Sequence, residues 1–209
     1  SVIVNSPGSG EAGVGEIVST SLSASAANTL YSNLGTATNI AAFHADARFS
    51  SVNGQGVTVV VIDSVIDLDH PSFGIDADGN GIADRIVFSY DFVGANDGNA
   101  SDVQGHGTHV AGIVGSSDAS YPGIAPEVNI IALRALGDDG NGSSGDLLEA
   151  LNWVVANAAR YNVVAVNLSL GFGTFDQTPS NGSAYFSATT QFKALANAGV
   201  IVVSASGNG

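Results

Sequence analysis

Hydrophobic residues along the chain gather in short runs that are separated by longer stretches of mixed polarity. Five such runs are rich in Val and Ile and have the pattern of strands buried on both faces. They are Val57–Asp63, Ile86–Phe92, Val128–Leu136, Val163–Leu170 and Val200–Val203. Each run is short and bounded by Gly, Asn or Asp, which favours strands over buried helices.

The stretches between the runs have helical periodicity. Leu147, Leu148, Leu151, Val154, Val155 and Ala158 form one apolar stripe at i, i+1, i+4, i+7, i+8 and i+11. Asp146 is expected to cap this helix, with Glu149 completing a capping box. Further helices are predicted at 40–49, from His106 onward, and at 188–198, where Gly199 stops the last one.

Strands alternating with helices predict an α/β fold, a mostly parallel sheet with helices on both faces. Residues 1–37 are rich in Ser, Ala, Gly and Asn and are expected to form an N-terminal arm, and residues 38–209 the folded part. Neither a repeat nor a linker divides that part. The chain stops directly after a strand, so we expect an incomplete domain.

Composition excludes several classes of function. The chain of 209 residues has a net charge of −14 and only five scattered basic residues, so nucleic acid is not an expected partner. An acidic surface suits solubility, cation binding or a salty medium. There is no Cys for disulfide or thiol chemistry. No apolar run reaches the ~20 residues of a membrane helix, so a membrane is not an expected partner either.

Three polar residues lie where a parallel sheet places its ligand-binding and catalytic groups, at the carboxyl ends of the strands. Asp63 ends one buried strand, His106 lies between two glycines at the start of a helix, and Asn208 follows the last strand. A carboxylate can fix the tautomer of an imidazole, and an amide can donate to a developing oxyanion. Together they are parts of an acyl-transfer site that still needs a nucleophile.

The motifs around these residues resemble the subtilase family of subtilisin-like serine proteases. Val60–Val65 with His70-Pro71 matches the family's aspartate motif, and His106–Gly112 matches its histidine motif in full. Asn167–Gly171, Leu136–Gly142 and Ser206–Asn208 match its substrate-binding strand, its Gly-rich stretch and its oxyanion segment. Five motifs in the family's order, from about Asn53 onward, make the resemblance specific.

The resemblance implies a subtilisin-like three-layer fold and a role for each matching residue. Asp63 would orient and stabilise the imidazolium of His106, His106 would act as general base and then general acid, and Asn208 would donate to the oxyanion. An extended polypeptide substrate would pair with two edge segments, and its side chain before the scissile bond would enter a slot of small residues. The edge segments are Gly140, Asn141 and Gly142, and Ser169, Leu170 and Gly171; the slot is Ser204, Ala205, Ser206 and Gly207. Such a slot predicts a preference for an apolar or aromatic side chain.

The sequence departs from the family in two places. Val65 stands where the family usually has Gly, and a β-branched residue does not accept positive φ, so the turn after Asp63 is expected to differ slightly. The segment that carries the nucleophilic serine is absent, since in the family it follows the oxyanion Asn and the chain ends at Gly209. The chain is then a truncated protease, one part of a nicked protease whose C-terminal remainder stays bound, or a non-catalytic relative. We favour the first two, because all three site residues are kept.

An acidic loop predicts a structural Ca²⁺ site. Asp76, Asp78, Asn80 and Asp84 occupy positions 1, 3, 5 and 9 of an EF-hand-type loop, with Gly81 at position 6. Position 12 is Val87, so the bidentate Glu is missing; a solvated acidic turn is the alternative. A zinc site using His106, His109 and His70 is a second metal hypothesis, but the His-Glu-x-x-His spacing of zinc proteases is absent.

Three hypotheses for function follow. The first is a secreted serine endopeptidase of the subtilisin type whose Ser lies beyond residue 209. The second is a peptide-binding subtilase relative without catalysis, and the third is a metal-dependent hydrolase that uses the histidines.

Overall fold

The computed structural model describes residues 38–93, 102, 104–171 and 188–205 in two compact units, 1–50 and 51–209. The predicted arm, residues 1–37, lies outside the described residues. In the first unit, α2 (Ile40–Ala45) forms where a helix over 40–49 is expected, but it ends earlier. The aromatic rings of Phe43 and Phe49 stack with their centroids 4.8 Å apart across that end.

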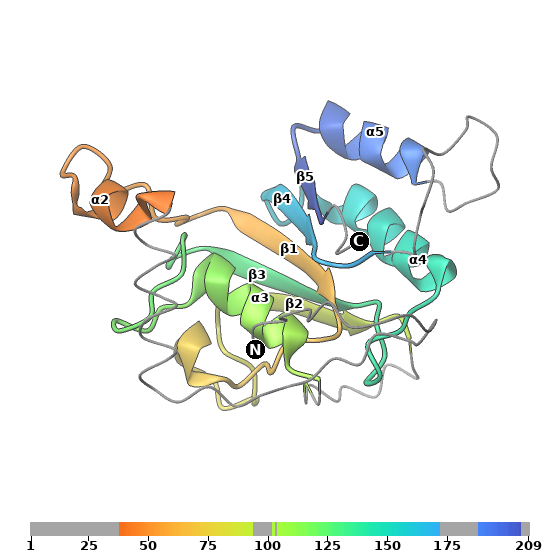
Figure 1. The fold of residues 1–209 in the computed structure, drawn as a ribbon, viewed down its shortest axis with the longest axis horizontal. Helices are drawn as coiled ribbons and strands as arrows, with labels where there is room; N and C mark the ends of the chain where they lie inside the picture. Colours follow the sequence, from red (N-terminus) through yellow and green to blue (C-terminus); the bar gives the residue numbers. More distant parts are fainter. Residues whose placement is uncertain (1–37, 94–101, 103, 172–187, 206–209) are drawn as a thin grey trace, which may run out of the picture. The chain divides into compact units, whose positions relative to one another are not determined.

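The second unit is built on one parallel sheet, and all five predicted strands form. They are β1 (Thr58–Asp63), β2 (Ile86–Asp91), β3 (Asn129–Arg134), β4 (Val163–Leu168) and β5 (Ile201–Ser204). The strand order is β2-β3-β1-β4-β5, and every pair is parallel (Figure 1). The predicted α/β class is confirmed.

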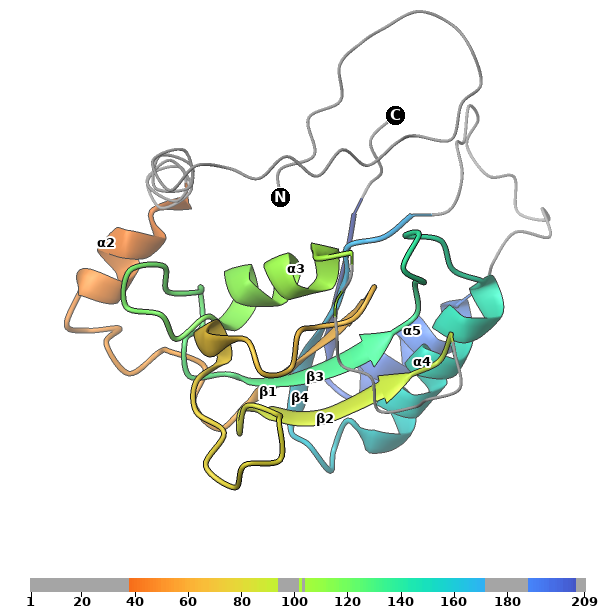
Figure 2. The same cartoon turned by 90° about the horizontal axis from the view of Figure 1, so that it is seen from below.

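Helices cover both faces of the sheet. Figures 1 and 2 show α3 (His106–Gly115) on one face and α4 (Ser144–Asn157) and α5 (Thr189–Asn197) on the other. Successive side chains of a strand point to opposite faces. Val60 and Ile62 of β1 therefore pack in the core under α4 and α5, while Val61 packs in the core under α3. Burial on both faces explains why β1 and β3 are nearly continuous apolar runs. The prediction of two buried faces is wrong for the edge strands β2 and β5: Ile201 and Val203 of β5 are 65% and 52% exposed, and only Ile86 of β2 is fully buried.

The prediction for the start of α4 is wrong by one turn. Ser143 is the N-cap, and its Oγ accepts a hydrogen bond from the Asp146 N–H at 3.1 Å. Asp146 is the third residue of the box, since its Oδ2 accepts from the Ser143 N–H at 3.3 Å. The N-cap thus lies three residues before the expected one, because the Ser143 side chain already accepts a free N–H of the first turn.

A partly buried cation ties the far end of α3 to its surroundings. The Arg85 guanidinium donates to the carbonyl oxygens of Phe73 at 3.2 Å, Gly115 at 2.6 Å, Pro126 at 2.8 Å and Val128 at 3.0 Å. Gly115 is the last residue of α3, so the positive charge lies at the negative end of the helix dipole. Burial lowers the pKa of Arg85. This contact fixes one end of the helix that begins with His106.

The direction of the strand order reverses at β1, which lies between β3 and β4. Ligands of open α/β sheets bind outside the carboxyl ends of strands at such a point. The carboxyl end of β1 is Asp63. Among the described helices, none is long and apolar enough to cross a membrane.

Candidate active site

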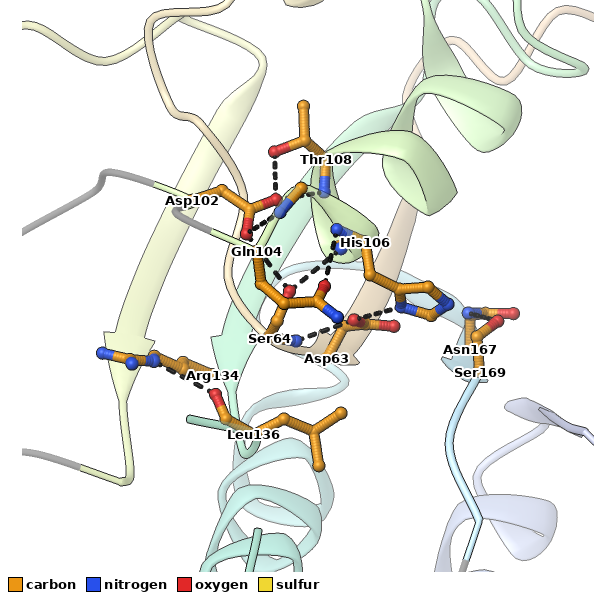
Figure 3. A network of polar contacts seen from close by, with 12 residues as sticks. Asp63, Ser64, Asp102, Gln104, His106, Thr108, Arg134, Leu136, Asn167 and Ser169 are labelled. Atoms are coloured by element: carbon orange, nitrogen blue, oxygen red, sulfur yellow. Dashed lines mark hydrogen bonds and ion pairs between the residues drawn. The ribbon is translucent and has the colours of Figure 1, made fainter. Parts of the chain in front are cut away.

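The carboxylate of Asp63 and the imidazole of His106 meet at the carboxyl edge of the sheet. The Nδ1 of His106 lies 2.7 Å from Oδ1 of Asp63 (Figure 3). The Asp63 side chain is 1% exposed, whereas that of His106 is 25% exposed. A buried acid therefore holds an imidazole that solvent or a ligand can still reach.

The surroundings of Asp63 fix its orientation. The Ser64 N–H also donates to Oδ1 of Asp63, at 2.7 Å, while Oδ2 is buried and has no partner among the described residues. The carbonyl oxygen of Asp63 accepts from the N–H groups of Ala135 at 2.9 Å and Leu136 at 3.1 Å. Asp63 is thus held in place through hydrogen bonds to both its side chain and its backbone.

His106 is the first residue of α3, as the sequence predicts. Gly105 precedes it with φ 81°, a left-handed conformation that suits glycine. The backbone N–H of His106 donates to Oε1 of Gln104 at 2.9 Å. The tight turn places the imidazole at the N-terminus of α3, facing β1.

The backbone of α3 approaches the loop after β1 very closely. A Cβ placed on Gly107 would lie 2.0 Å from the carbonyl oxygen of Val65. Positive φ at non-glycine residues occurs, within the described ranges, only at Asn39 and Asn162. Val65 thus has no left-handed conformation, and its β-branched side chain fits the turn without that strain.

Electrostatics favour a proton on His106. The hydrogen bond that His106 donates to Asp63 raises the pKa of His106 above its usual value of 6.5, burial partly offsets this, and the charges of Asp63 and Asp102 raise the pKa further. The imidazole needs a proton on Nδ1 to donate to Asp63, so in the neutral ring Nε2 is the acceptor. That arrangement is the one a general base needs.

The two predicted edge segments meet at one pocket. A cavity of about 180 Å³ is lined by Leu136, Gly140, Asn141, Gly142, Ser143, Leu147, Leu170 and Gly171. Ser169 directly precedes the pocket residues Leu170 and Gly171. Its Oγ accepts a hydrogen bond from Nδ2 of Asn167 at 2.9 Å (Figure 3). Asn167 lies beside Val61 in the β1–β4 register, which brings the residues after β4 toward Asp63.

The slot of small residues is described only in part. Ser204 ends β5, and Ala205 follows it, with its N–H donating to the carbonyl oxygen of Leu168 at 3.1 Å. Both side chains are exposed. Ser206, Gly207 and the proposed oxyanion donor Asn208 lie outside the described residues.

The acidic loop brings its carboxylates together. One oxygen from each of Asp76, Asp78 and Asp84 lies within 4.8 Å of the others. Both oxygens of Asp76 accept backbone N–H groups, Oδ1 from Gly79 at 2.8 Å and Oδ2 from Gly81 at 2.8 Å, and these bonds lower the pKa of Asp76. Asn80 belongs to the same loop, where its side-chain Nδ2 donates to Asp78 at 3.0 Å.

The zinc hypothesis gains no support from this geometry. In the described part of the chain, the only group of three potential ligands is that of Asp76, Asp78 and Asp84, which contains no histidine. His70 instead accepts the Ser72 N–H at its Nδ1, at 3.2 Å, and caps the short 3₁₀ helix Pro71–Phe73.

Asp102 contributes to the site although the sequence gives it no role there. Its carboxylate accepts hydrogen bonds from Gly105 and Thr108 at the start of α3 and from Ser64 beside Asp63. The signal available in the sequence is weak: an acidic residue shortly before a helix is typical of a cap.

Comparisons with known proteins agree with this geometry. A family model described as the subtilase family matches residues 54–209. The chain is 41% identical over 124 residues to alkaline serine exoprotease A of Vibrio alginolyticus, covering 59% of this chain and 20% of that protein. It is 33% identical over 178 residues to subtilisin-like protease 3 of Arthroderma benhamiae, covering 84% of this chain and 38% of the relative. The chain therefore spans well under half the length of these curated relatives.

A solved structure shares the fold. The crystal structure of a cold adapted subtilisin-like serine proteinase superposes with a TM-score of 0.53 at 33% sequence identity. The match covers 75% of this chain and 48% of that one. The predicted subtilisin-like architecture is confirmed.

Proposed function

This chain belongs to the subtilase family, and from that premise we propose that it supplies the acid and the base of a serine endopeptidase of the subtilisin type. The observation that carries the proposal is the 2.7 Å contact between Nδ1 of His106 and Oδ1 of Asp63 at the reversal point of the sheet. The nucleophilic serine would come from sequence beyond residue 209, in the same polypeptide or in a C-terminal remainder that stays bound. The curated relatives support this, because most of their length has no counterpart in these 209 residues.

In this proposal His106 moves the proton. Its Nε2 takes the proton of the serine hydroxyl while that oxygen attacks the peptide carbonyl, and the imidazolium then gives the proton to the leaving amine. Asp63 holds the Nδ1–H in place and stabilises the positive ring. Asn208 is proposed to donate to the oxyanion, an interaction that is worth about 10²–10³ in kcat where such a donor has been removed.

The substrate is proposed to be an extended polypeptide. It would lie between Gly140–Gly142 and Ser169–Gly171, with main-chain hydrogen bonds providing affinity. The pocket where Leu136 and Leu170 meet supports this placement, because an apolar side chain of the substrate would find apolar contacts there. The preference for an apolar or aromatic substrate side chain at the slot formed by Ser204, Ala205, Ser206 and Gly207 stays a prediction.

A fluorophosphonate probe tests the reaction class, because it labels only an activated serine. We expect one serine of the natural polypeptide that contains these residues to be labelled, and the His106→Ala variant to remain unlabelled. Labelling that persists during brief chelation excludes the metal-dependent hydrolase. An unlabelled natural polypeptide that still binds extended peptides would contradict the proposal and favour the alternative, a non-catalytic peptide-binding relative.

We also propose that the acidic loop binds Ca²⁺ for structural support. The donor set consists only of oxygens, as Ca²⁺ prefers, from Asp76, Asp78, Asn80 and Asp84. The clustering of three carboxylates and the low pKa of Asp76 support the proposal, since both keep negative charge in the loop. The loop ends directly before Arg85, so an ordered loop would also hold in place the hydrogen bonds that Arg85 makes at the end of α3.

Calcium titration tests this site. Without a Glu at position 12 we expect a Kd of about 10⁻⁴–10⁻³ M, so that 10 mM Ca²⁺ stabilises the chain by about 1–3 kcal/mol. Isothermal titration and thermal melts of Asp78→Ala should show both effects largely lost. Asp118→Ala, which removes an exposed carboxylate from another loop, is the matched control and should keep them. Unchanged calcium binding by Asp78→Ala would contradict the assignment.

The setting is proposed to be extracellular, as the resemblance to subtilisin-like proteases implies. One relative is named an exoprotease, which supports this. Measuring the protein in cells and in culture medium would decide the point.

A further inference from the structure

We propose that Asp102 is a positioning residue of this site: with the hydroxyls of Ser64 and Thr108, its carboxylate locks the first turn of α3 to the loop after β1 and so keeps His106 within reach of Asp63. The inference rests on the proposed function, in which His106 and Asp63 act together. Asp102 itself touches neither the substrate nor the reacting atoms in this proposal.

Asp102 acts first as the missing cap of α3. The N-cap position is Gly105, which has no side chain to bind the free N–H groups of the first turn. The carboxylate of Asp102 takes over this task. Its Oδ1 accepts the Gly105 N–H at 2.8 Å, and its Oδ2 accepts the Thr108 N–H at 2.9 Å. A negative charge at this end of a helix is also stabilised by the helix dipole.

Two hydroxyls connect this cap to the loop that follows Asp63. Ser64 Oγ donates to Oδ1 of Asp102 at 3.2 Å and accepts the Gly107 N–H at 3.0 Å. Thr108 Oγ1 donates to Oδ2 of Asp102 at 2.5 Å and accepts the Asp67 N–H at 2.9 Å. Each hydroxyl thus donates to the carboxylate and accepts a backbone N–H, so the network has a defined direction.

The network contacts both the Asp63 carboxylate and the helix start that carries His106. The N–H of Ser64 donates to Oδ1 of Asp63, the same oxygen that meets His106. Figure 3 shows Asp102 and Thr108 on the side of the Asp63–His106 contact away from Asn167 and Ser169, with Ser64 next to Asp63. If the carboxylate of Asp102 were lost, the two hydroxyls would be free to rotate. The N–H groups of Gly105 and Thr108 would also lose their acceptor. The helix start could then shift relative to β1.

Charge gives the proposal a second readout. The charged or titratable groups around His106 are Asp63 on β1, Asp102 before α3 and His109 on the same helix, and both carboxylates favour the imidazolium. Replacing Asp102 with neutral Asn therefore lowers the pKa of His106. This titration reports the charge of Asp102 near His106 separately from any change in stability, while the kinetic variants below report positioning.

The test compares Asp102→Asn with the unchanged protein and with Asp118→Asn. Asp118 also caps a turn with its carboxylate, accepting the Ser120 N–H at 2.7 Å, but it follows the other end of α3. NMR titration of the 209-residue chain should show a lower pKa for His106 in Asp102→Asn and no change in Asp118→Asn. In the natural polypeptide, kcat should fall about 10- to 100-fold with KM unchanged, as expected for a small displacement of catalytic groups.

The pH profile should move in a defined direction. The base must be neutral, so activity falls as pH drops through the pKa of His106. With Asp102→Asn that pKa is lower, and the acid limb of kcat/KM moves to lower pH although the plateau is reduced.

A pair of substitutions at Thr108 separates positioning from folding. Thr108→Val removes the hydroxyl and should reduce kcat, while Thr108→Ser keeps the hydroxyl and should restore it. If Asp102→Asn does not fold, this pair decides the proposal alone. Equal kcat in Thr108→Val and Thr108→Ser, or an unchanged His106 pKa in a folded Asp102→Asn, overturns it. The NMR arm needs no catalysis, so a natural polypeptide that fails to label with fluorophosphonate contradicts the protease proposal and not this one.

Discussion

His106→Ala is expected to lower kcat for peptide hydrolysis by the natural polypeptide by about 10⁴- to 10⁶-fold, because the proposed reaction has no other base for the serine proton. Asp63→Asn should cost about 10⁴-fold. The Asn side chain fits the same space but can offer its N–H₂ group to Nδ1 and so favour the wrong tautomer of the imidazole. The 1% exposure of Asp63 leaves no room for water to take over the role of the carboxylate.

The two substitutions should act as one unit. Since Asp63 works only through His106, the double variant His106→Ala/Asp63→Asn should be about as active as His106→Ala alone. Steady-state kinetics of the two single variants and the double variant measure this. Asp118→Asn is the control for the same chemical change outside the site and should keep full activity. Independent, multiplying losses would contradict the direct pairing seen at 2.7 Å.

Gly107→Ala is expected to destabilise the chain by about 3 kcal/mol or more, at the upper end of what overpacking costs. The new Cβ would lie 2.0 Å from the carbonyl oxygen of Val65 and 3.1 Å from its backbone N. Both obstacles are backbone atoms, so no side chain can rotate away. The loop after β1 and the start of α3 must separate, and activity should fall with stability because Asp63 directly precedes this loop and His106 begins α3.

Gly112→Ala is the matched control on the same helix. A Cβ on Gly112 would meet nothing within 4 Å apart from the helix itself and its chain neighbours. Replacing Gly by Ala at such a helical position should be neutral or should stabilise by about 0.5–1 kcal/mol. Urea unfolding of both variants of the 209-residue chain gives the two values. Similar stabilities would show that the close approach of α3 to Val65 is not a tight constraint.

Much of the fold could be predicted from the sequence because its signals are local. Each of the five strands is marked by its own apolar run, although the edge strands β2 and β5 are only partly buried, and the parallel orientation is expected from the helices that separate most of the strands. Asp63 and His106 could be expected to meet because strand ends and helix starts gather at one edge of such a sheet. The start of α4 was predicted wrongly, since Asp146 is a good cap in sequence and only its mutual hydrogen bonds with Ser143 show that Ser143 holds the N-cap position.

Asp102 and Arg85 could not be assigned in this way. Asp102 bonds to Ser64, 38 positions earlier, and its identity as a cap for α3 depends on a glycine occupying the N-cap position. Arg85 looks like one of five scattered basic residues in the sequence. Its four acceptors come from three segments and are backbone carbonyls, which have no signature in a sequence.

The same property of Arg85 has a consequence for the sequence around it. Because the guanidinium binds main-chain oxygens of Phe73, Gly115, Pro126 and Val128, the contact makes no demand on the side chains at those positions. Only position 85 needs a particular residue, since only arginine presents a planar fork of five donors. The guanidinium contacts therefore add no constraint to the side chains of those segments beyond their own packing, and a substitution at position 85 would remove all four hydrogen bonds at once.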